Sequence, residues 1–344
     1  MSQHKYQHDF SWGDTRGVRK VMDNELRRIG LHIVPQDLNG FGYPPHEGYP
    51  ELIVQVRKLI KDLANLEYKY VLITNGATHG LNAYIYAAKR MHGHRKEITG
   101  LVTKKLYFPF YPQIATINGL NHKNYSPNFD GNLPHLDDLG IIDSPSNPEG
   151  VMSRGGLSGT RVVWDAAYHS PTYCGVEKEG KLVCPNIFPA HEAMVGSLNK
   201  LTGINGLRVG WLATNSWSLY TDALHYAETT LCGVSGPSQE YATKILERVD
   251  LHPFYCQSKK VLDENRNELQ RLGYLFGGQP IFPYGMFALF EVDDSLKDLF
   301  EKASVNVKRG KDIGDERQSV RINLANTNES MKAMVDAVLK IDKS

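Results

Sequence analysis

One lysine of this 344-residue chain stands in a setting that could do chemistry. Lys200 follows an apolar run (residues 193–195) and Ser197, and Arg208 comes eight residues later in a glycine-rich turn. Burial lowers the pKa of an amine, and a neutral amine forms a Schiff base with an aldehyde. Ser197 and Arg208 offer donors for an anion. An aldehyde that carries an anion describes pyridoxal 5′-phosphate, whereas residue type alone would favour a solvated loop lysine.

A carboxylate follows a second apolar segment. Residues 161–165 indicate a short buried strand that ends at Asp165, and Tyr168 lies three residues further on. A carboxylate in that place could keep a pyridine nitrogen protonated, which makes the ring an electron sink. Tyr168, and Asn147 in a turn rich in Pro and Asn, could both reach the phenolic oxygen of the ring. Taken singly, Asp165 could be a strand-end cap and Asn147 a turn former.

A third segment could hold a phosphate. Residues 70–74 form a continuous apolar run, Asn75-Gly76-Ala77-Thr78 is a turn, and apolar residues then recur at helical spacing. The backbone amides of Gly76, Ala77 and Thr78 are therefore expected at the positive end of a helix dipole. The alternative is an ordinary helix N-cap formed by Thr78.

With these parts in order, the chain resembles the fold type I pyridoxal-phosphate enzymes, and within them the class I/II aminotransferases. The resemblance runs from Tyr43 to Arg321. It rests on seven segments: Tyr43-Pro44 with Gly48 and Glu51-Leu52, the turn at Gly76, the aromatic run at Phe108, Asn147-Pro148-Glu149-Gly150, Asp165 with Tyr168, Ser197 with Lys200 and Arg208, and Ser319-Val320-Arg321.

The resemblance implies roles that the residues alone do not give. It implies that Tyr43 reaches the phosphate of a neighbouring subunit, and hence a homodimer with a shared active site. It implies that Phe108 stacks on the cofactor and that Arg321, with Asn147, binds the substrate carboxylate. The catalytic residues are then Lys200, Asp165 and Tyr168, and the other expected cofactor contacts are Gly76, Ala77, Thr78, Phe108, Asn147, Ser197, Arg208 and Tyr43.

The chain departs from the family pattern in three places. Asn199 stands where the family has a serine, Glu149 replaces a threonine and Ala166 replaces a glutamate. None of these changes removes a residue with a chemical role. The Asn-Pro-Glu-Gly variant, together with Val307-Lys308-Arg309-Gly310 ahead of Ser319-Val320-Arg321, resembles the branch that holds alliinases and aromatic amino-acid aminotransferases.

These assignments predict an aminotransferase that moves an amino group between an L-amino acid and a 2-oxo acid by a ping-pong mechanism through a Lys200 Schiff base. Lys200, once released, would act as the general base at Cα. A leaving group on the β-carbon would allow elimination instead, so a carbon–sulfur lyase stays open as the alternative. A cofactor-free binding protein is the most distant alternative, because it would have no reason to retain Lys200, Asp165 and Arg208 together.

Composition agrees with a soluble, cytoplasmic enzyme. The 39 Lys and Arg balance 38 Asp and Glu, so nothing indicates a nucleic-acid or acidic-membrane partner. No apolar run is long enough to span a bilayer, and the N-terminus lacks the apolar core of a signal peptide. The four cysteines are widely spaced and are expected to be reduced thiols.

The order of the segments predicts an α/β fold of the pyridoxal-phosphate transferase type. We expect strands at residues 71–74, 100–103, 141–142, 162–164, 193–195 and 209–213, in a mainly parallel sheet of the seven-stranded type. A helix over 259–272, strands near 287–292 and 319–324 and a last helix around Met331 predict a smaller α+β domain. The expected divisions are an N-terminal arm at 1–48, a large cofactor-binding domain at 49–245 and a small domain at 246–344.

Other motifs carry less weight. The glycines of residues 155–159 precede a strand rather than opening a helix, which excludes a dinucleotide loop. His92-Gly93-His94 lacks a third ligand, so a surface turn is favoured and no metal site is expected. Residues 37–41 and the N-terminal loops are expected to set side-chain specificity. Phe41, Tyr107, Tyr168 and His169 would favour a bulky substrate.

Overall fold

The computed structural model describes residues 7–31, 42–92, 97–125, 138–152, 161–185, 192–279, 281 and 284–343, apart from the side chain of residue 92. Several sequence predictions lie outside these residues: the glycine-rich segment 155–159, the metal-site alternative around residues 92–94, and the specificity loop 37–41 with Phe41. No helix in the described part of the chain is both long and apolar enough to cross a membrane.

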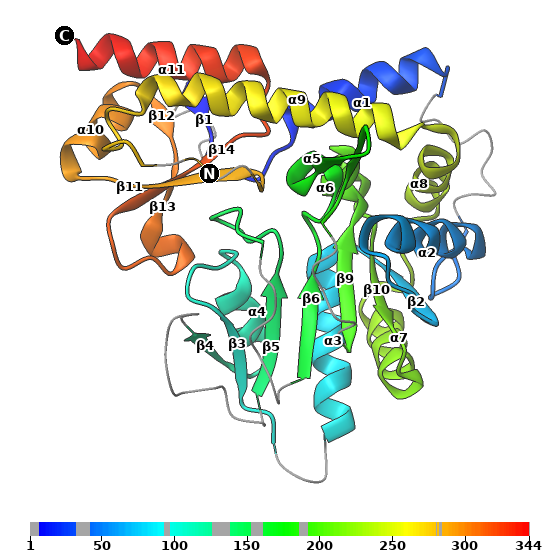
Figure 1. Ribbon diagram of the computed structural model, residues 1–344. Helices are drawn as coiled ribbons and strands as arrows, with labels where there is room; N and C mark the ends of the chain where they lie inside the picture. Colours follow the sequence, from blue (N-terminus) through cyan, green and yellow to red (C-terminus); the bar gives the residue numbers. More distant parts are fainter. Residues whose placement is uncertain are drawn as a thin grey trace.

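A seven-stranded sheet forms the centre of the larger part of the molecule (Figure 1). Its strand order is β2-β10-β9-β6-β5-β3-β4. All neighbours are parallel except β10, which is antiparallel to both β2 and β9. The strands are β2 (Tyr70–Thr74), β3 (Gly100–Lys104), β4 (Asn121–Tyr125), β5 (Asp138–Asp143), β6 (Arg161–Asp165), β9 (Ala193–Ser197) and β10 (Gly210–Thr214).

Helices cover both faces of this sheet, which explains why its central strands are apolar throughout. Successive residues of a strand point to opposite faces. Leu72 and Val163 therefore pack into one core with α3, and Ile73 and Trp164 pack into the other. The helices of this region are α2 (Pro50–Ala64), α3 (Ala77–His92), α4 (Tyr111–Ile117), α5 (Pro171–Cys174), α6 (Leu198–Thr202), α7 (Trp217–Leu231) and α8 (Gly236–Arg248). A two-stranded hairpin, β7 (Val176–Lys178) and β8 (Lys181–Val183), follows α5.

A three-stranded antiparallel sheet lies in the smaller part of the molecule, with strand order β11-β14-β13. It consists of β11 (Phe287–Glu291), β13 (Lys308–Arg309) and β14 (Ser319–Asn323). A separate core joins this sheet to α10 (Asp294–Lys302) and α11 (Asn328–Asp342). The short strand β1 (His8–Asp9) pairs in parallel with β12 (Val305–Asn306), so the N-terminal segment packs against this part of the chain.

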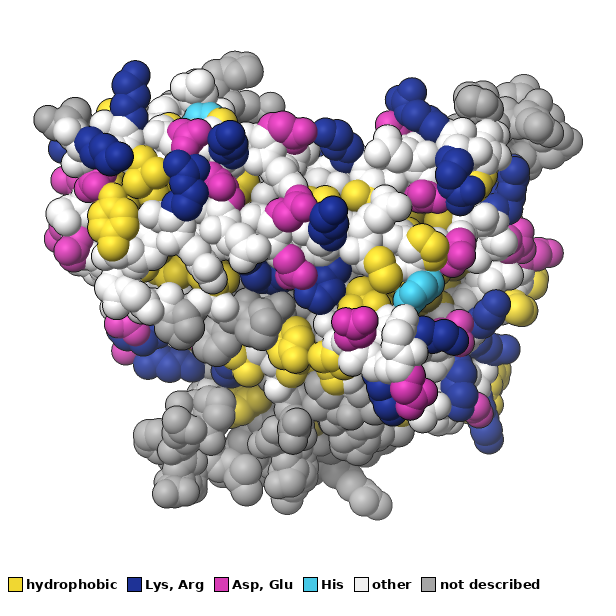
Figure 2. All heavy atoms as spheres, turned by 45° about the horizontal axis from the view of Figure 1, so that its top comes forward, with side chains coloured by type: hydrophobic (Ala, Val, Ile, Leu, Met, Phe, Trp, Pro, Cys, Tyr) yellow, Lys and Arg dark blue, Asp and Glu magenta, His cyan; other side chains and the backbone are white. Residues whose placement is uncertain are grey.

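One long helix, α9 (Leu251–Leu269), runs across the top of Figure 1 above both sheets. It contacts α11 near one end and α1 (Arg16–Arg28) toward the other, and it also contacts α5. Three short 3-10 turns complete the described structure, at Asn205–Leu207, Gln270–Leu272 and Gly310–Ile313. On the face shown in Figure 2, Lys and Arg side chains are interspersed with Asp and Glu.

The predicted fold class is confirmed, and each predicted strand is found within three residues of its expected bounds. The predicted helix over 259–272 was wrong at its start, because α9 begins at Leu251. The Asp250 side chain caps it by accepting a hydrogen bond from the His252 amide at 3.1 Å. Strand β4 was not predicted, since its sequence, Asn-His-Lys-Asn-Tyr, is polar and lies at the sheet edge. The domain boundaries stay a prediction.

Candidate active site

A cavity of about 1020 Å³ opens at the carboxyl end of the large sheet. The last residues of three strands line it: Asp143 of β5, Asp165 of β6 and Ser197 of β9. Open α/β sheets place their ligands at this end. The opposite wall comes from the N-terminal segment and the small sheet, and includes Ser11, Gly13, Asp14, Phe287, Lys308, Arg309 and Arg321.

Lys200 is carried into this cavity by α6, the short helix that directly follows β9. Its Nζ donates to the Gly13 carbonyl at 2.5 Å and to Asn205 Oδ1 at 3.2 Å. Burial lowers the pKa of Lys200 to about 8, assisted by the positive charges of Arg208 and Arg321 and opposed by Asp14. At pH 7 roughly a tenth of this amine is therefore uncharged and nucleophilic, far more than for an ordinary lysine.

Asp165 is a buried carboxylate with two fixed donors. The Tyr111 hydroxyl donates to Oδ2 at 2.9 Å, and the Ala167 amide donates to Oδ1 at 3.1 Å. Burial raises its pKa to about 6 against these two hydrogen bonds. Asp143 lies beside Asp165 in the β5–β6 register, and burial together with the Asp165 charge raises the Asp143 pKa to about 7. A positively charged or proton-donating group beside Asp165 would therefore stabilise its ionised form.

A chain of polar side chains crosses the cavity from β6 to β14. Asn147 donates through Nδ2 to the Tyr168 hydroxyl at 3.4 Å, and its Oδ1 accepts from Arg321 Nη1 at 2.7 Å. The Asn147 backbone amide donates to Asp143 Oδ2 at 2.8 Å, which fixes the turn. Burial raises the pKa of Tyr168, so its hydroxyl stays protonated. Asn147 and Arg321 are 174 residues apart in the chain, and only the fold joins them.

Arg321 is the buried cation of the cavity. Its guanidinium lies over the Phe287 ring, with Cζ at 3.9 Å from the ring centroid, and Nη2 donates to the Ser11 carbonyl at 2.8 Å. Burial lowers its pKa to about 10, so it remains charged at neutral pH. Its buried Nε has no hydrogen-bond partner among the described residues. A buried guanidinium held this way is suited to bind a carboxylate.

The other end of the cavity has the features of an anion cradle. Gly76 has a φ of +80°, and a Cβ there would lie 2.9 Å from Arg208 Nη2 and 3.2 Å from Asn199 Nδ2. The amides of Ala77 and Thr78 are in the first turn of α3, where no intrahelical acceptor exists. The Gly76 amide differs from the prediction, since it donates to the Thr74 carbonyl at 2.8 Å. Thr78 lies inside the helix and is not its cap.

The structure brings most of the predicted residues together around one cavity. Those that line it are Ala77, Thr78, Phe108, Asn147, Asp165, Tyr168, Ser197, Lys200, Arg208 and Arg321. Gly76 borders the same space through its approach to Arg208. Tyr43 does not belong to the set, because its side chain is 92% exposed. Of the residues expected to shape the substrate pocket, Tyr107 lines the cavity and His169 is buried outside its lining.

Several residues of the cavity were missed by sequence reasoning. Tyr111 could have been found, because it belongs to the same aromatic run as Phe108. Asp143 ends an apolar strand just as Asp165 does, so the same signal was available. The contributions of Ser11 and Gly13 are backbone carbonyls, which any residue supplies. No sequence pattern could have indicated them.

Comparison with known proteins gives both a family and a fold. A family model described as "Allinase" (Alliinase_C) matches residues 48–271. The chain is 26% identical over 314 residues to "Tryptophan aminotransferase-related protein 2" of Arabidopsis thaliana. This match covers 80% of this chain and 67% of the relative. The chain is 23% identical over 236 residues to "Alliin lyase" of Allium cepa var. aggregatum, covering 58% of this chain and 51% of the relative. The chain thus spans between about half and two thirds of these relatives.

Among solved structures, the fold is similar to an aspartate aminotransferase mutant of Thermus thermophilus complexed with tryptophan. The TM-score is 0.77 at 14% identity, over 98% of this chain and 92% of the other. At this level of identity the similarity concerns the fold alone.

Proposed function

Since the chain belongs to the alliinase family, whose members use pyridoxal 5′-phosphate on the aminotransferase fold, we propose that it is an aminotransferase acting on an L-amino acid and a 2-oxo acid. One observation carries the proposal. A partly buried amine on Lys200, a buried carboxylate on Asp165 and a buried guanidinium on Arg321 line the same cavity.

The residues present fit pyridoxal phosphate. Lys200 would hold its aldehyde carbon, Asp165 its pyridine nitrogen, and Tyr168 with Asn147 its phenolic oxygen. The phosphate would lie against Arg208, Ser197 and the first turn of α3, where Gly76 leaves the space that a Cβ would fill. Asp165 fits because a carboxylate with a raised pKa gains most from a cationic partner.

When bound, the cofactor supplies an aldehyde for the amino group and a ring that takes up electrons released at Cα. The chain supplies position and proton transfer. Arg321 binds the substrate carboxylate in a fixed orientation, and Asn147 holds Arg321 in place at 2.7 Å. Lys200 Nζ, with its pKa lowered to about 8, takes the proton from Cα as a general base.

Two half-reactions would share these residues. In the first, the amino acid leaves as a 2-oxo acid, and in the second, another 2-oxo acid leaves as an amino acid. Arg321 would bind the substrate in both half-reactions, because the amino acid and the 2-oxo acid each carry a carboxylate next to the reacting carbon. The site therefore binds the two substrates one after the other, which is the physical basis of the proposed ping-pong order.

We also propose that the active site is completed in a homodimer. Tyr43 is 92% exposed and does not line the cavity of its own chain. A large aromatic side chain with that exposure is available to a second copy. The resemblance to the class I/II aminotransferases supports a contact between Tyr43 and the phosphate held by the neighbouring subunit.

A carbon–sulfur lyase is the second candidate, favoured by the family match and by the alliin lyase relative. Both reactions begin with the loss of the Cα proton to Lys200. They diverge afterwards, according to whether the substrate carries a leaving group on its β-carbon.

The test is a single-turnover assay of the cofactor-loaded enzyme with a panel of amino acids, including aromatic ones and S-substituted cysteines. Transamination predicts about one equivalent of 2-oxo acid per site, no ammonia, and recovery of the starting absorbance when a 2-oxo acid is added. Continuous release of pyruvate and ammonia would identify the lyase. If no amino acid produced either result while Lys200→Ala behaved like the wild type, both proposals would be rejected.

A further inference from the structure

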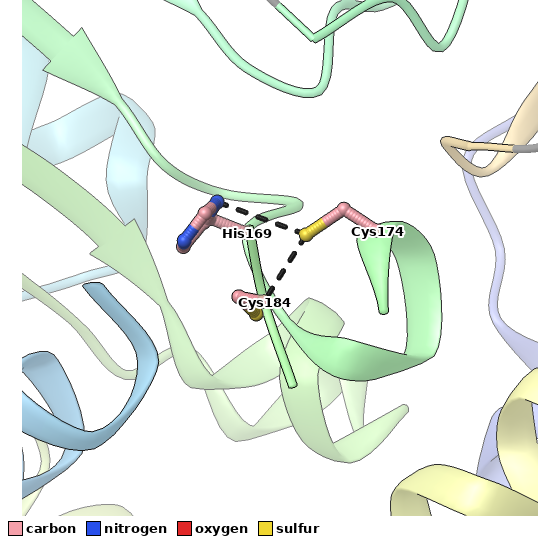
Figure 3. A group of neighbouring side chains, drawn as sticks. All are labelled: His169, Cys174 and Cys184. Atoms are coloured by element: carbon pink, nitrogen blue, oxygen red, sulfur yellow. Dashed lines mark hydrogen bonds between the residues drawn. The ribbon is translucent and has the colours of Figure 1, made fainter. Parts of the chain in front are cut away.

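Three potential metal ligands meet in the interior, beside the segment that carries Tyr168. His169 follows β6, Cys174 ends α5, and Cys184 follows β8. All three are buried, and one ligand atom from each lies within 4.8 Å of the other two. Figure 3 shows their side chains turned toward one another, with the Cys174 sulfur linked to both other residues. The spacing of the cysteines does not indicate this group, because nine residues lie between Cys174 and Cys184.

The histidine presents a lone pair to the cysteines. Its Nε2 lies 3.1 Å from the Leu63 carbonyl, and a carbonyl can only accept. Nε2 therefore carries the hydrogen, and in the neutral ring Nδ1 carries the lone pair. Nδ1 lies 3.7 Å from Cys174 Sγ. A hydrogen bond from the far ring nitrogen to a backbone carbonyl is the usual way in which proteins orient a metal-binding histidine.

The spacing suits a tetrahedral cation. For Zn–S of about 2.3 Å and Zn–N of about 2.0–2.1 Å, neighbouring ligands of a tetrahedron lie about 3.5–3.8 Å apart. Cys174 Sγ is 3.7 Å from both Cys184 Sγ and His169 Nδ1. Two of the three ligand–ligand edges thus have the required length. The third, between Cys184 and His169, lies within 4.8 Å, and metal binding would draw these two ligand atoms closer together.

Buried hydroxyl groups near these residues lack hydrogen-bond partners in the described structure. They belong to Ser170 and Thr172, on the segment between His169 and Cys174, and to Tyr255 of α9. Tyr255 belongs to α9, which contacts both α5 and β8. Buried polar atoms without partners indicate a missing water or ion. A metal-bound water would donate a hydrogen bond to such a hydroxyl oxygen.

We propose that His169, Cys174 and Cys184 bind one Zn²⁺ ion, with water in the fourth position. Two sulfurs and one imidazole nitrogen are a zinc ligand set, and three protein ligands leave one place for water. On binding, each thiol releases its proton to solvent, and nothing is oxidised or reduced.

The ion would stabilise the segments that carry Tyr168 and Tyr173, which lie next to the proposed cofactor site. His169 is adjacent to Tyr168, and Cys174 is adjacent to Tyr173, whose hydroxyl donates to the Lys200 carbonyl at 2.8 Å. Cys184 directly follows β8, so it would connect the β7–β8 hairpin to the same ion. One ion would therefore tie the loop after β6, helix α5 and the hairpin into a single unit that contacts α6.

The first test uses the wild-type holoenzyme, purified without chelators, exposed to one equivalent of Zn²⁺ and desalted. We expect about one zinc per chain by elemental analysis. The zinc X-ray absorption spectrum should fit two sulfurs at about 2.3 Å and two lighter ligands, one nitrogen and one oxygen, at about 2.0–2.2 Å. Removal of the metal by a chelator should lower the unfolding temperature, and added Zn²⁺ should restore it.

The second test compares Cys184→Ser with Cys256→Ser, which alters an exposed cysteine. Only Cys184→Ser should lose the bound zinc. The proposal is overturned if the wild type retains no zinc, if both variants retain it equally, or if peptide mapping finds Cys174 and Cys184 joined as a disulfide in the purified protein. The wild-type chelator experiment decides the matter even if Cys184→Ser does not fold.

Discussion

At the scale of single residues, the proposed chemistry depends on an amine that burial keeps partly neutral. The pKa of Lys200 is lowered to about 8 from an ordinary value of 10.5. An amine attacks an aldehyde only in its neutral form. The rate of covalent attachment of pyridoxal phosphate should therefore rise about tenfold per pH unit below pH 8, as the neutral fraction grows, and level off above it.

Asp14 allows the cause of that pH dependence to be tested. Its negative charge raises the pKa of Lys200, against the lowering by burial. Asp14→Asn should therefore move the midpoint of the attachment rate to lower pH, measured by stopped-flow absorbance over a pH series. Asp23→Asn is the control, because Asp23 forms an exposed ion pair with Arg27. An unchanged midpoint in Asp14→Asn would contradict the electrostatic explanation.

Arg321 gives a second prediction at this scale. Arg321→Lys keeps the charge but loses the planar fork that a carboxylate binds. Charge-assisted hydrogen bonds are worth about 1.5–3 kcal/mol, so KM for the amino acid should rise about 10- to 100-fold. Cofactor affinity should change little.

The control for Arg321→Lys is Arg317→Lys, since Arg317 is half exposed and pairs with Asp315 outside the cavity. Steady-state kinetics and a cofactor titration of both variants are the measurements. Equal KM values for the two variants would show that Arg321 does not bind the substrate carboxylate.

At the scale of elements, the cradle at the start of α3 depends on a residue without a side chain. Gly76→Ala would place a Cβ 2.9 Å from Arg208 Nη2 and force φ = +80° on an alanine. The left-handed backbone costs about 1–2 kcal/mol. Gly30→Ala is a matched control, because Gly30 has φ = +63° and nothing within 4 Å of its Cβ position.

Both glycine variants should therefore lose similar stability, but only Gly76→Ala should bind pyridoxal phosphate and inorganic phosphate more weakly. Denaturant unfolding and a ligand titration separate the two effects. If Gly30→Ala weakened phosphate binding to the same degree, backbone strain rather than the cradle would be the cause.

The strands of the large sheet could be predicted from apolar runs in the sequence, and the polar site residues from their positions at the ends of these runs. Asp165 and Ser197 each close a strand that is buried on both faces, and such strands are continuous apolar segments in the sequence. The polar edge strand β4 had no such signal. The meeting of His169 with Cys174 and Cys184 also had none, because it depends on how α5 and the following hairpin fold back.

At the scale of the whole molecule, the N-terminal segment closes the cavity by bonds to the far end of the chain. Asn323 Nδ2 donates to the Trp12 carbonyl at 2.8 Å and to the Asp14 carbonyl at 2.7 Å. This segment supplies the carbonyls that hold Lys200 and Arg321. The sequence could not show this arrangement, since it joins backbone carbonyls near the N-terminus to a side chain about 310 residues away.

Asn323→Ala should therefore loosen the segment, lower stability by about 1–3 kcal/mol and raise KM. Asn265→Ala is the matched control: Asn265 also makes two hydrogen bonds to buried carbonyls, those of Leu324 and Asn326, both at 2.8 Å. It should lose comparable stability with KM unchanged. A KM increase of the same size in both variants would show that general destabilisation is responsible.

The most direct test of the central claim is to find which residue holds the cofactor. The purified protein is loaded with pyridoxal phosphate, reduced with borohydride and digested, and the modified peptide is located by mass spectrometry. We predict one cofactor per chain on Lys200, and its loss from that peptide when a reactive amino acid is added before reduction. Modification spread over exposed lysines, or a Lys200 peptide that stays unmodified, would contradict the account.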